Sequence, residues 1–274
     1  MKTKSRNERV KERYLRKYEK YLKGDFSGLS LIGKKTEPSL GTAPSSTPSE
    51  DTPAVVAFFD GLCEPRNPHG VPCYGYVIYS AVRERVGDGF GLAAEPWSWQ
   101  ASNNVAEYQA LIRALEWLLE HNYQDTTVIV KGDSQLAIRQ MQGTYAVNAP
   151  RIVPLHRTAK KLAQRFKQIR FQWVPREDNK EADLLSQRAY AEYMLRRARK
   201  EADAITWDKI AKLPDGRFLV QRSTVDLTAE TCSCAESKRH QTRLDVKIAC
   251  RHIIAAQKLA SEATSDGDVR IFNS

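Results

Sequence analysis

The sequence predicts an α/β protein with a mixed five-stranded sheet and flanking helices, followed by a small C-terminal module. Residues 54–61 form a nearly continuous run of Val, Ala and Phe, which is typical of a strand buried on both faces. A second apolar run, at 126–130, precedes a helical pattern. Three cysteines and a histidine gathered after residue 230 predict that the C-terminal module binds a metal.

The other elements follow from alternation, helical periodicity and turn residues. Residues 74–80 and 85–94 are predicted strands, and with the first strand they can form an antiparallel meander. A further strand at 169–174 is stopped by Pro175. Helices are predicted at 102–121, 134–142, 153–166 and 181–200.

A carboxylate lies at the end of each central strand. Asp60 closes the first apolar run, and Asp133 follows the second. If the two strands are parallel neighbours, these side chains lie about 5 Å apart at the carboxyl edge of the sheet, where ligands of open α/β sheets collect. Two carboxylates so close repel one another unless a cation lies between them. The sequence therefore predicts a cation site at this edge.

Glu107 is a third candidate for that site. At 100° per residue it lies on the same helical stripe as Leu111, Ala114 and Leu118, which should face the core. A Glu in the first helical turn can simply complement the helix dipole. The cost of burying an unpaired carboxylate favours the site instead.

Asp183 is the fourth candidate. Asp178 and Glu181 resemble a capping box, which places Asp183 in the first turns of the last helix. Its position alone does not distinguish it from an ordinary surface carboxylate.

The charge of the chain is concentrated at its N-terminus. The net charge is +10, and residues 2–23 contribute +7 of it, from ten Lys or Arg and three Glu. This segment is either a solvated tail or an arm that binds nucleic acid. Residues 34–53 contain four prolines among Ser, Thr and Gly, and are predicted to be a linker.

Four stretches in order resemble the motifs of type 1 ribonuclease H. They are Phe59–Cys63 with Asn67-Pro68, then 103–111, 132–136 and 173–183. The last stretch is similar to the subfamily without the inserted basic helix and loop. The resemblance covers residues 54–198 of the 274-residue chain.

The resemblance implies a ribonuclease H-like fold and an endonuclease that hydrolyses the RNA strand of RNA–DNA hybrids. It implies that the catalytic residues are Asp60, Glu107, Asp133 and Asp183. They would hold two Mg²⁺ or Mn²⁺ ions about 4 Å apart, one activating water and the other stabilising the leaving oxygen. Nucleic-acid contacts are expected from Gly61, Asn103, Asn104, Gln135 and Arg176.

One feature departs from the family pattern. Many members have a His in the loop before the last carboxylate, where it is thought to help product or metal leave. Residues 174–179 contain no His, so we expect slower turnover or assistance from Arg176. His156 lies in a different predicted helix and is expected at the surface.

Two other functions fit the same motifs. The domain could bind nucleic acid without cleaving it, although all four carboxylates are present. It could also process DNA, since a fold does not fix a function. The motifs at 103–104 and 133–135 favour hybrid cleavage.

The C-terminal module contains Cys232, Cys234, Cys250 and His252, in the pattern C-x-C, fifteen residues, C-x-H. These are the four ligands of a closed structural zinc site, while the alternative is buried cysteines with an unrelated His. A hairpin at 217–227 and an apolar helix at 253–259 predict a ββα-like unit. The pattern resembles the SWIM zinc module, whose members bind nucleic acid or protein partners. Basic residues within 236–247 suit phosphate contacts.

The predicted organisation has six parts, and the protein is expected to be a cytoplasmic monomer with no membrane span. The parts are a basic segment (1–33), a linker (34–53), the ribonuclease H-like domain (54–198), a connector (199–216), the zinc module (217–262) and a tail (263–274).

Overall fold

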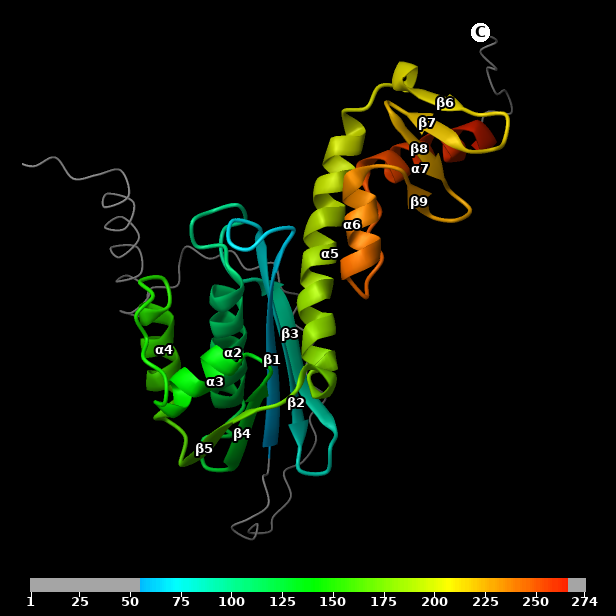
Figure 1. The fold of residues 1–274 in the computed structure, drawn as a ribbon. Coiled ribbons are helices and arrows are strands. Elements are labelled where there is room, and N and C mark those ends of the chain that lie inside the picture. Colours follow the sequence, from blue (N-terminus) through cyan, green and yellow to red (C-terminus); the bar gives the residue numbers. More distant parts are fainter. Residues whose placement is uncertain (1–54, 266–274) are drawn as a thin grey trace, which may run out of the picture. The chain divides into compact units, whose positions relative to one another are not determined.

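The computed structural model describes residues 55–265, apart from the side chains of residues 242–243 and 263–265. The chain divides into two compact units between Ala189 and Tyr190 (Figure 1). The predicted basic segment 1–33 and linker 34–53 lie outside the described residues, as does most of the predicted tail. No helix within residues 55–265 is both long enough and apolar enough to cross a membrane.

The first unit is built on a five-stranded mixed sheet with the strand order β3-β2-β1-β4-β5. Strands β1, β2 and β3 form an antiparallel meander, while β4 is parallel to both β1 and β5. The predicted meander and the mixed sheet are both confirmed. The strands are β1 (Val55–Glu64), β2 (Val71–Ser80), β3 (Arg85–Leu92), β4 (Thr127–Gly132) and β5 (Gln168–Trp173).

Strand β1 differs from its predicted form in two ways. It continues through Asp60 to Glu64, because all ten of its residues are paired with β2. Asp60 therefore lies within the strand rather than at its end. Burial on both faces holds only for residues 59–61, since Val56 and Phe58 are half-buried.

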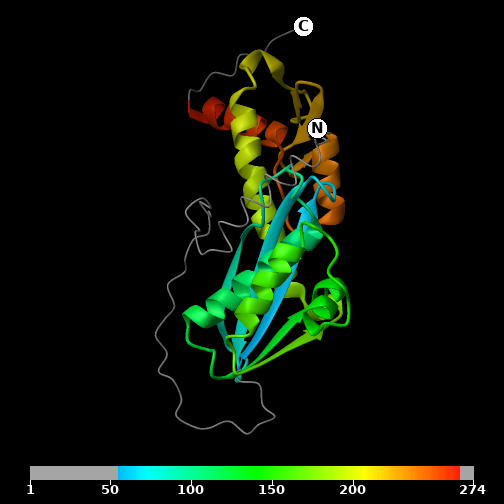
Figure 2. The ribbon, with the colours of Figure 1, turned by 90° about the vertical axis from the view of Figure 1, so that its left-hand side faces the viewer.

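Four helices flank this sheet. Figures 1 and 2 show α2, α3 and α4 together on one face, and α2 has the most extensive contact with β1. Ser102 and Ser134 cap α2 and α3, because each side chain accepts a backbone N–H of the first turn. The helices are α2 (Asn103–Glu120), α3 (Gln135–Gln142), α4 (Val153–Ala163) and α5 (Lys180–Asp203).

Two glycines allow helix backbones to approach the sheet closely. A Cβ atom on Gly61 would lie 2.1 Å from the backbone nitrogen of Glu107 in α2. A Cβ atom on Gly75 would lie 2.4 Å from the carbonyl oxygen of Ala182 in α5. Because no side chain fits at either position, α2 rests directly on β1 and α5 rests directly on β2.

The predicted capping box at the start of α5 is wrong. Residues Arg176–Asp178 form a single 3-10 turn, and α5 begins at Lys180. The residue that precedes the helix is therefore Asn179, whose side chain is buried and directed toward the sheet.

The second unit contains residues 190–203 of α5, a four-stranded antiparallel sheet with the order β6-β7-β8-β9, and the helices α6 and α7. Its core includes Phe218, Val220, Val225 and Ile253. The predicted hairpin and C-terminal helix are present. The sequence analysis missed β6, β9 and α6, so the unit is larger than the expected ββα arrangement. The elements are a 3-10 turn (Trp207–Lys209), β6 (Ile210–Lys212), β7 (Phe218–Val220), β8 (Ser223–Asp226), β9 (Thr231–Cys232), α6 (Ala235–Arg243) and α7 (Arg251–Ser265).

Substituting Gly61→Ala should lower the free energy of unfolding by about 1–3 kcal/mol, because the new methyl group would overlap the α2 backbone. The matched control is Gly91→Ala in β3, where the nearest atoms are 3.2 Å away at the edge of the Tyr74 ring. The control should change stability by no more than about 0.5 kcal/mol. Urea titration of the two variants measures the difference, and equal effects would contradict the close packing at Gly61.

Candidate functional site

Three buried or half-buried carboxylates converge at one end of the parallel strand pair. One oxygen atom each from Asp60, Glu107 and Asp133 lies within 4.8 Å of the others. The three come from β1, from the first turns of α2 and from the residue that follows β4. This spacing allows one ion to contact all three, which makes the group a candidate cation site.

Strand register brings Asp60 and Asp133 together. Phe58 pairs with Lys131 in the parallel ladder of β1 and β4, so each carboxylate is two residues beyond the same pair. Strand β4 ends at Gly132, and Asp133 begins the turn into α3, while β1 continues along β2. The predicted proximity of these two residues is thus a consequence of parallel pairing in register.

Close packing of α2 on β1 brings Glu107 to the same place. Its backbone nitrogen lies over Gly61, and its side chain is 5% exposed. The predicted core-facing stripe is confirmed, since Leu111, Ala114 and Leu118 are fully buried. Glu107 is therefore the polar end of an otherwise apolar helix face.

Asp183 lies beside this group but is not one of the three that converge. Its Oδ1 accepts a hydrogen bond from Arg176 at 2.9 Å, and its Oδ2 accepts one from Gln187 at 3.0 Å. Arg176 itself is 69% exposed at its side chain. The fourth predicted carboxylate is thus held by a cation from the preceding 3-10 turn and by an amide from the next turn of its own helix.

Two residues that the sequence analysis did not single out hold the carboxylates in place. The side-chain amide of Asn179 donates to Asp133 Oδ1 at 2.8 Å and to the carbonyl of Phe59 at 2.9 Å. The hydroxyl of Ser186 donates to Asp60 Oδ2 at 2.6 Å. Their spacing from Asp183, four residues before and three after, places them on its side of α5. This spacing from Asp183 is the only feature of the sequence that could have pointed to Asn179 and Ser186 as residues of the site.

Burial and mutual repulsion disfavour ionised carboxylates here. Burial, then the charges of Asp133 and Asp183, raise the pKa of Asp60 to about 7, against a lowering contribution from Ser186. Burial followed by the charge of Asp60 raises the pKa of Glu107 well above its usual value. The Oε2 atom of Glu107 is buried without a hydrogen-bond partner among the described residues. A divalent cation would supply both the missing contact and the missing charge.

The first unit resembles known proteins in sequence. The family model described as "Reverse transcriptase-like" matches residues 77–189. Ribonuclease HI of Halobacterium salinarum is 36% identical over 137 residues, which are 49% of this chain and 63% of that protein. The bifunctional protein Rv2228c of Mycobacterium tuberculosis is 36% identical over 114 residues, 41% of this chain and 29% of that protein.

The first unit is similar in sequence to ribonuclease HI. Among solved structures, RNase H1 from Halobacterium salinarum is 33% identical, covering 50% of this chain and 98% of that one, with a TM-score of 0.46. The LC11-RNase H1 in complex with an RNA/DNA hybrid is 32% identical, covering 51% and 98%, with a TM-score of 0.46. The chain spans less than a third of the mycobacterial relative's length and less than two thirds of the archaeal one's.

The residues predicted to contact nucleic acid differ in their exposure. Asn104 and Gln135 are exposed in the first turns of α2 and α3. Asn103 is half-buried, and its side-chain amide is 3.4 Å from Glu107 Oε1. Gly61 is buried under α2, while Arg176 is exposed beside Asp183. The first turns of α2 and α3 therefore present exposed polar groups beside the carboxylates.

His156 is not the surface residue that the sequence predicts. It is half-buried in α4, where its ring packs edge-on against Tyr108. Its Nε2 lies 3.3 Å from the carbonyl oxygen of Gln140. These contacts tie α4 to α2 and α3 and give His156 a packing role.

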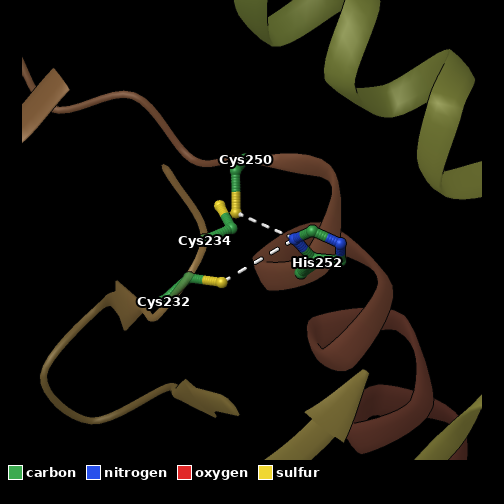
Figure 3. A group of neighbouring side chains, drawn as sticks. All are labelled: Cys232, Cys234, Cys250 and His252. Atoms are coloured by element: carbon green, nitrogen blue, oxygen red, sulfur yellow. Dashed lines mark hydrogen bonds between the residues drawn. The ribbon is translucent and has the colours of Figure 1, made fainter. Parts of the chain in front are cut away.

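In the second unit, the predicted cysteines and histidine form a compact cluster (Figure 3). One ligand atom each from Cys232, Cys234, Cys250 and His252 lies within 4.8 Å of the others. The Nδ1 atom of His252 is 3.7 Å from Cys232 Sγ and 3.9 Å from Cys250 Sγ. All five cysteines of the chain are free thiols, so this cluster is not a disulfide.

Helix starts hold two of these thiols. Cys234 caps α6, and its sulfur accepts the backbone N–H of Ser237 at 3.4 Å. Cys250 directly precedes α7. Hydrogen bonds from Cys232 and Cys250 lower the pKa of Cys234, and the positive ends of the helix dipoles act in the same direction. Three sulfurs and one imidazole nitrogen are a donor set suited to zinc.

Asp60→Asn should stabilise the protein in chelator at pH 8. Burial raises the pKa of Asp60 in the folded protein from its ordinary 3.8 to about 7, so ionisation opposes folding as pH rises from about 4 to 7. The advantage of the Asn variant should therefore shrink as pH falls through 7 toward 4. Melting temperatures across this range measure it, with Asp125→Asn at an exposed carboxylate as the control. An equal pH dependence of the melting temperature in the two variants would contradict repulsion between the buried carboxylates.

Proposed function

We propose that this protein is a ribonuclease H, an endonuclease that hydrolyses the RNA strand of RNA–DNA hybrids with divalent metal ions. The observation that carries the proposal is the convergence of Asp60, Glu107 and Asp133 from three separate elements. The Halobacterium relative, named Ribonuclease HI, supports the assignment of the activity.

The carboxylates are the residues that would hold Mg²⁺ or Mn²⁺. Asp60, Glu107 and Asp133 converge, and Asp183 lies one turn of α5 beyond Asn179. When bound, the metal supplies activation of a water nucleophile and stabilisation of the leaving oxygen. Asn179 keeps the Asp133 carboxylate fixed relative to β1. Arg176 restrains Asp183 while its own side chain stays exposed.

Substrate choice would come from polar groups around the carboxylates. Asn103, Asn104 and Gln135 lie in the first turns of two helices whose N-termini favour phosphate groups. Side-chain amides both donate and accept hydrogen bonds, which suits the 2′-hydroxyls of one strand. Gly61 keeps the backbones of β1 and α2 close beneath this surface.

The domain belongs, in our proposal, to the type 1 subfamily without a basic protrusion. Helix α3 ends at Gln142 and α4 starts at Val153, so only ten residues connect them. A connection of this length has no room for an inserted helix and loop. The proposed enzyme acts as a monomer in the cytoplasm, and the basic residues 1–33 add affinity for the polyanionic substrate.

For the second unit we propose a SWIM-type module that holds one structural zinc ion. The donor set of Cys232, Cys234, Cys250 and His252 fits zinc and leaves no position for a catalytic water. Exposed Lys238 and Arg239 on α6 suit contacts with phosphates. The module would contribute binding, to nucleic acid or to a protein partner, rather than chemistry.

Asp133→Asn should retain the fold and hybrid binding but lose hybrid cleavage in Mg²⁺, because a carboxylate charge of the metal site is removed. The assay uses an end-labelled RNA–DNA hybrid beside matched duplex DNA, duplex RNA and single-stranded RNA. Wild-type protein should cut only the hybrid. Cleavage of duplex DNA would favour the DNA-processing alternative, and wild-type turnover by the variant would contradict the metal assignment.

Cys250→Ser should release one zinc ion per chain and loosen residues 217–262, because it removes a thiolate ligand. The ribonuclease H-like domain should stay folded and cleave hybrids at raised substrate concentration. Cys63→Ser, at a buried thiol of the first unit, is the control and should retain the metal. Elemental analysis after purification without chelator gives the stoichiometry. A wild-type value near zero, with three freely reactive thiols, would refute the zinc site.

A further inference from the structure

A buried hydroxyl group touches the carboxylate cluster from α5. Ser186 is fully buried, and its Oγ lies 2.6 Å from Asp60 Oδ2. We propose that Ser186 is a positioning residue for metal binding, which fixes the orientation of the Asp60 carboxylate. The inference rests on the proposed role of the carboxylates as a divalent metal site.

The position of this hydroxyl follows from the packing of α5 on β2. Asp60 and Gly75 are direct partners across the antiparallel β1–β2 ladder. A Cβ atom on Gly75 would lie 2.5 Å from the backbone nitrogen of Ser186. Since Gly75 has no side chain, the α5 backbone rests on β2 at this point. The side chain of Ser186 then reaches the carboxylate on the adjacent strand.

The hydroxyl has one proton and two acceptors in reach. Besides Asp60 Oδ2, the carbonyl oxygen of Asp183 lies 2.9 Å from Ser186 Oγ. Serine in a helix often donates to a backbone carbonyl of the preceding turn, with no functional consequence. Metal binding requires Asp60 in its ionised form, which is a stronger acceptor than a carbonyl, and 2.6 Å is typical of charge-assisted bonds between hydroxyl groups and carboxylates. The proton therefore belongs on the bond to Asp60.

Each carboxylate of the site has its own hydrogen-bond donor. Asn103 approaches Glu107, Asn179 donates to Asp133, and Arg176 and Gln187 donate to Asp183. Within residues 55–265, Ser186 is the hydrogen-bond donor that the structure gives to Asp60. Without it, this carboxylate would have no fixed orientation from side-chain hydrogen bonding. Groups that orient metal ligands typically contribute 10–100-fold to metal affinity.

The direct test is Mn²⁺ binding to the full chain without nucleic acid, followed by electron paramagnetic resonance. Ser186→Ala should weaken Mn²⁺ binding by about 10–100-fold. Ser223→Ala, at a buried serine of the second unit, is the matched control and should bind Mn²⁺ like wild type. Thermal unfolding of each variant in chelator is measured beside the titration.

A double-mutant cycle separates positioning from general stability. If Ser186 acts through Asp60, Ser186→Ala should have little further effect on Mn²⁺ affinity in an Asp60→Asn background. An equal loss in both backgrounds would overturn the inference. So would wild-type Mn²⁺ affinity in Ser186→Ala, or failure of that variant to fold, since the hydroxyl would then serve structure alone.

The outcomes also separate this inference from the proposed function. If wild type cleaves no hybrid but Ser186→Ala still weakens Mn²⁺ binding, the inference stands and the enzymatic proposal fails. If hybrids are cleaved and Mn²⁺ affinity is unchanged in Ser186→Ala, the enzymatic proposal stands and the role inferred for Ser186 fails. No Mn²⁺ binding by wild type would overturn both.

Discussion

The carboxylate site depends on the parallel pairing of β1 with β4, which sets Asp60 beside Asp133. A slip of one residue in this register would turn Asp133 to the other side of the sheet relative to Asp60. The observed pairing of Phe58 with Lys131 keeps both carboxylates level. Helices α2 and α5 then add Glu107 and Asp183 only because Gly61 and Gly75 let their backbones rest on the strands.

The site places several carboxylates in a buried environment, where ionised groups are energetically unfavourable. Burial and repulsion raise the pKa values of Asp60 and Glu107, so the protein without a cation favours protonated carboxyl groups. Asn179, Ser186 and Arg176 offset part of this cost through hydrogen bonds and one positive charge. A divalent cation bound there would offset more of this cost, and its binding would then be coupled to deprotonation and to folding.

The second unit has a small hydrophobic core. Its apolar cluster draws on short strands of two to four residues and on one face of α7. Cys232 and Cys250 belong to this cluster as well as to the group of four candidate ligands. A metal held there would crosslink β9, the start of α6 and the start of α7, and small domains commonly depend on such links.

Sequence alone was sufficient for the elements with strong local signals. Caps at Ser102 and Ser134, apolar periodicity and the strand runs located nearly every element of the first unit to within a few residues. It failed where local signals were weak, as at the three-residue strand β6 and the polar helix α6. These elements depend on partners distant in the chain rather than on their own composition.

Some features of the candidate site can likewise be read from the sequence, and others only from the tertiary structure. Carboxylates after apolar runs and the C-x-C and C-x-H spacing are visible in the chain, because such residue types are costly to bury without a ligand. Only the tertiary structure showed that Asp183 stands apart from the convergent three, and that Asn179 and Ser186 hold the others. The physical reason is that these hydrogen bonds join residues far apart in the chain. Asn179 and Asp133 are 46 residues apart, and Ser186 and Asp60 are 126 apart, so both bonds depend on how α5 approaches the sheet. No local pattern encodes that approach.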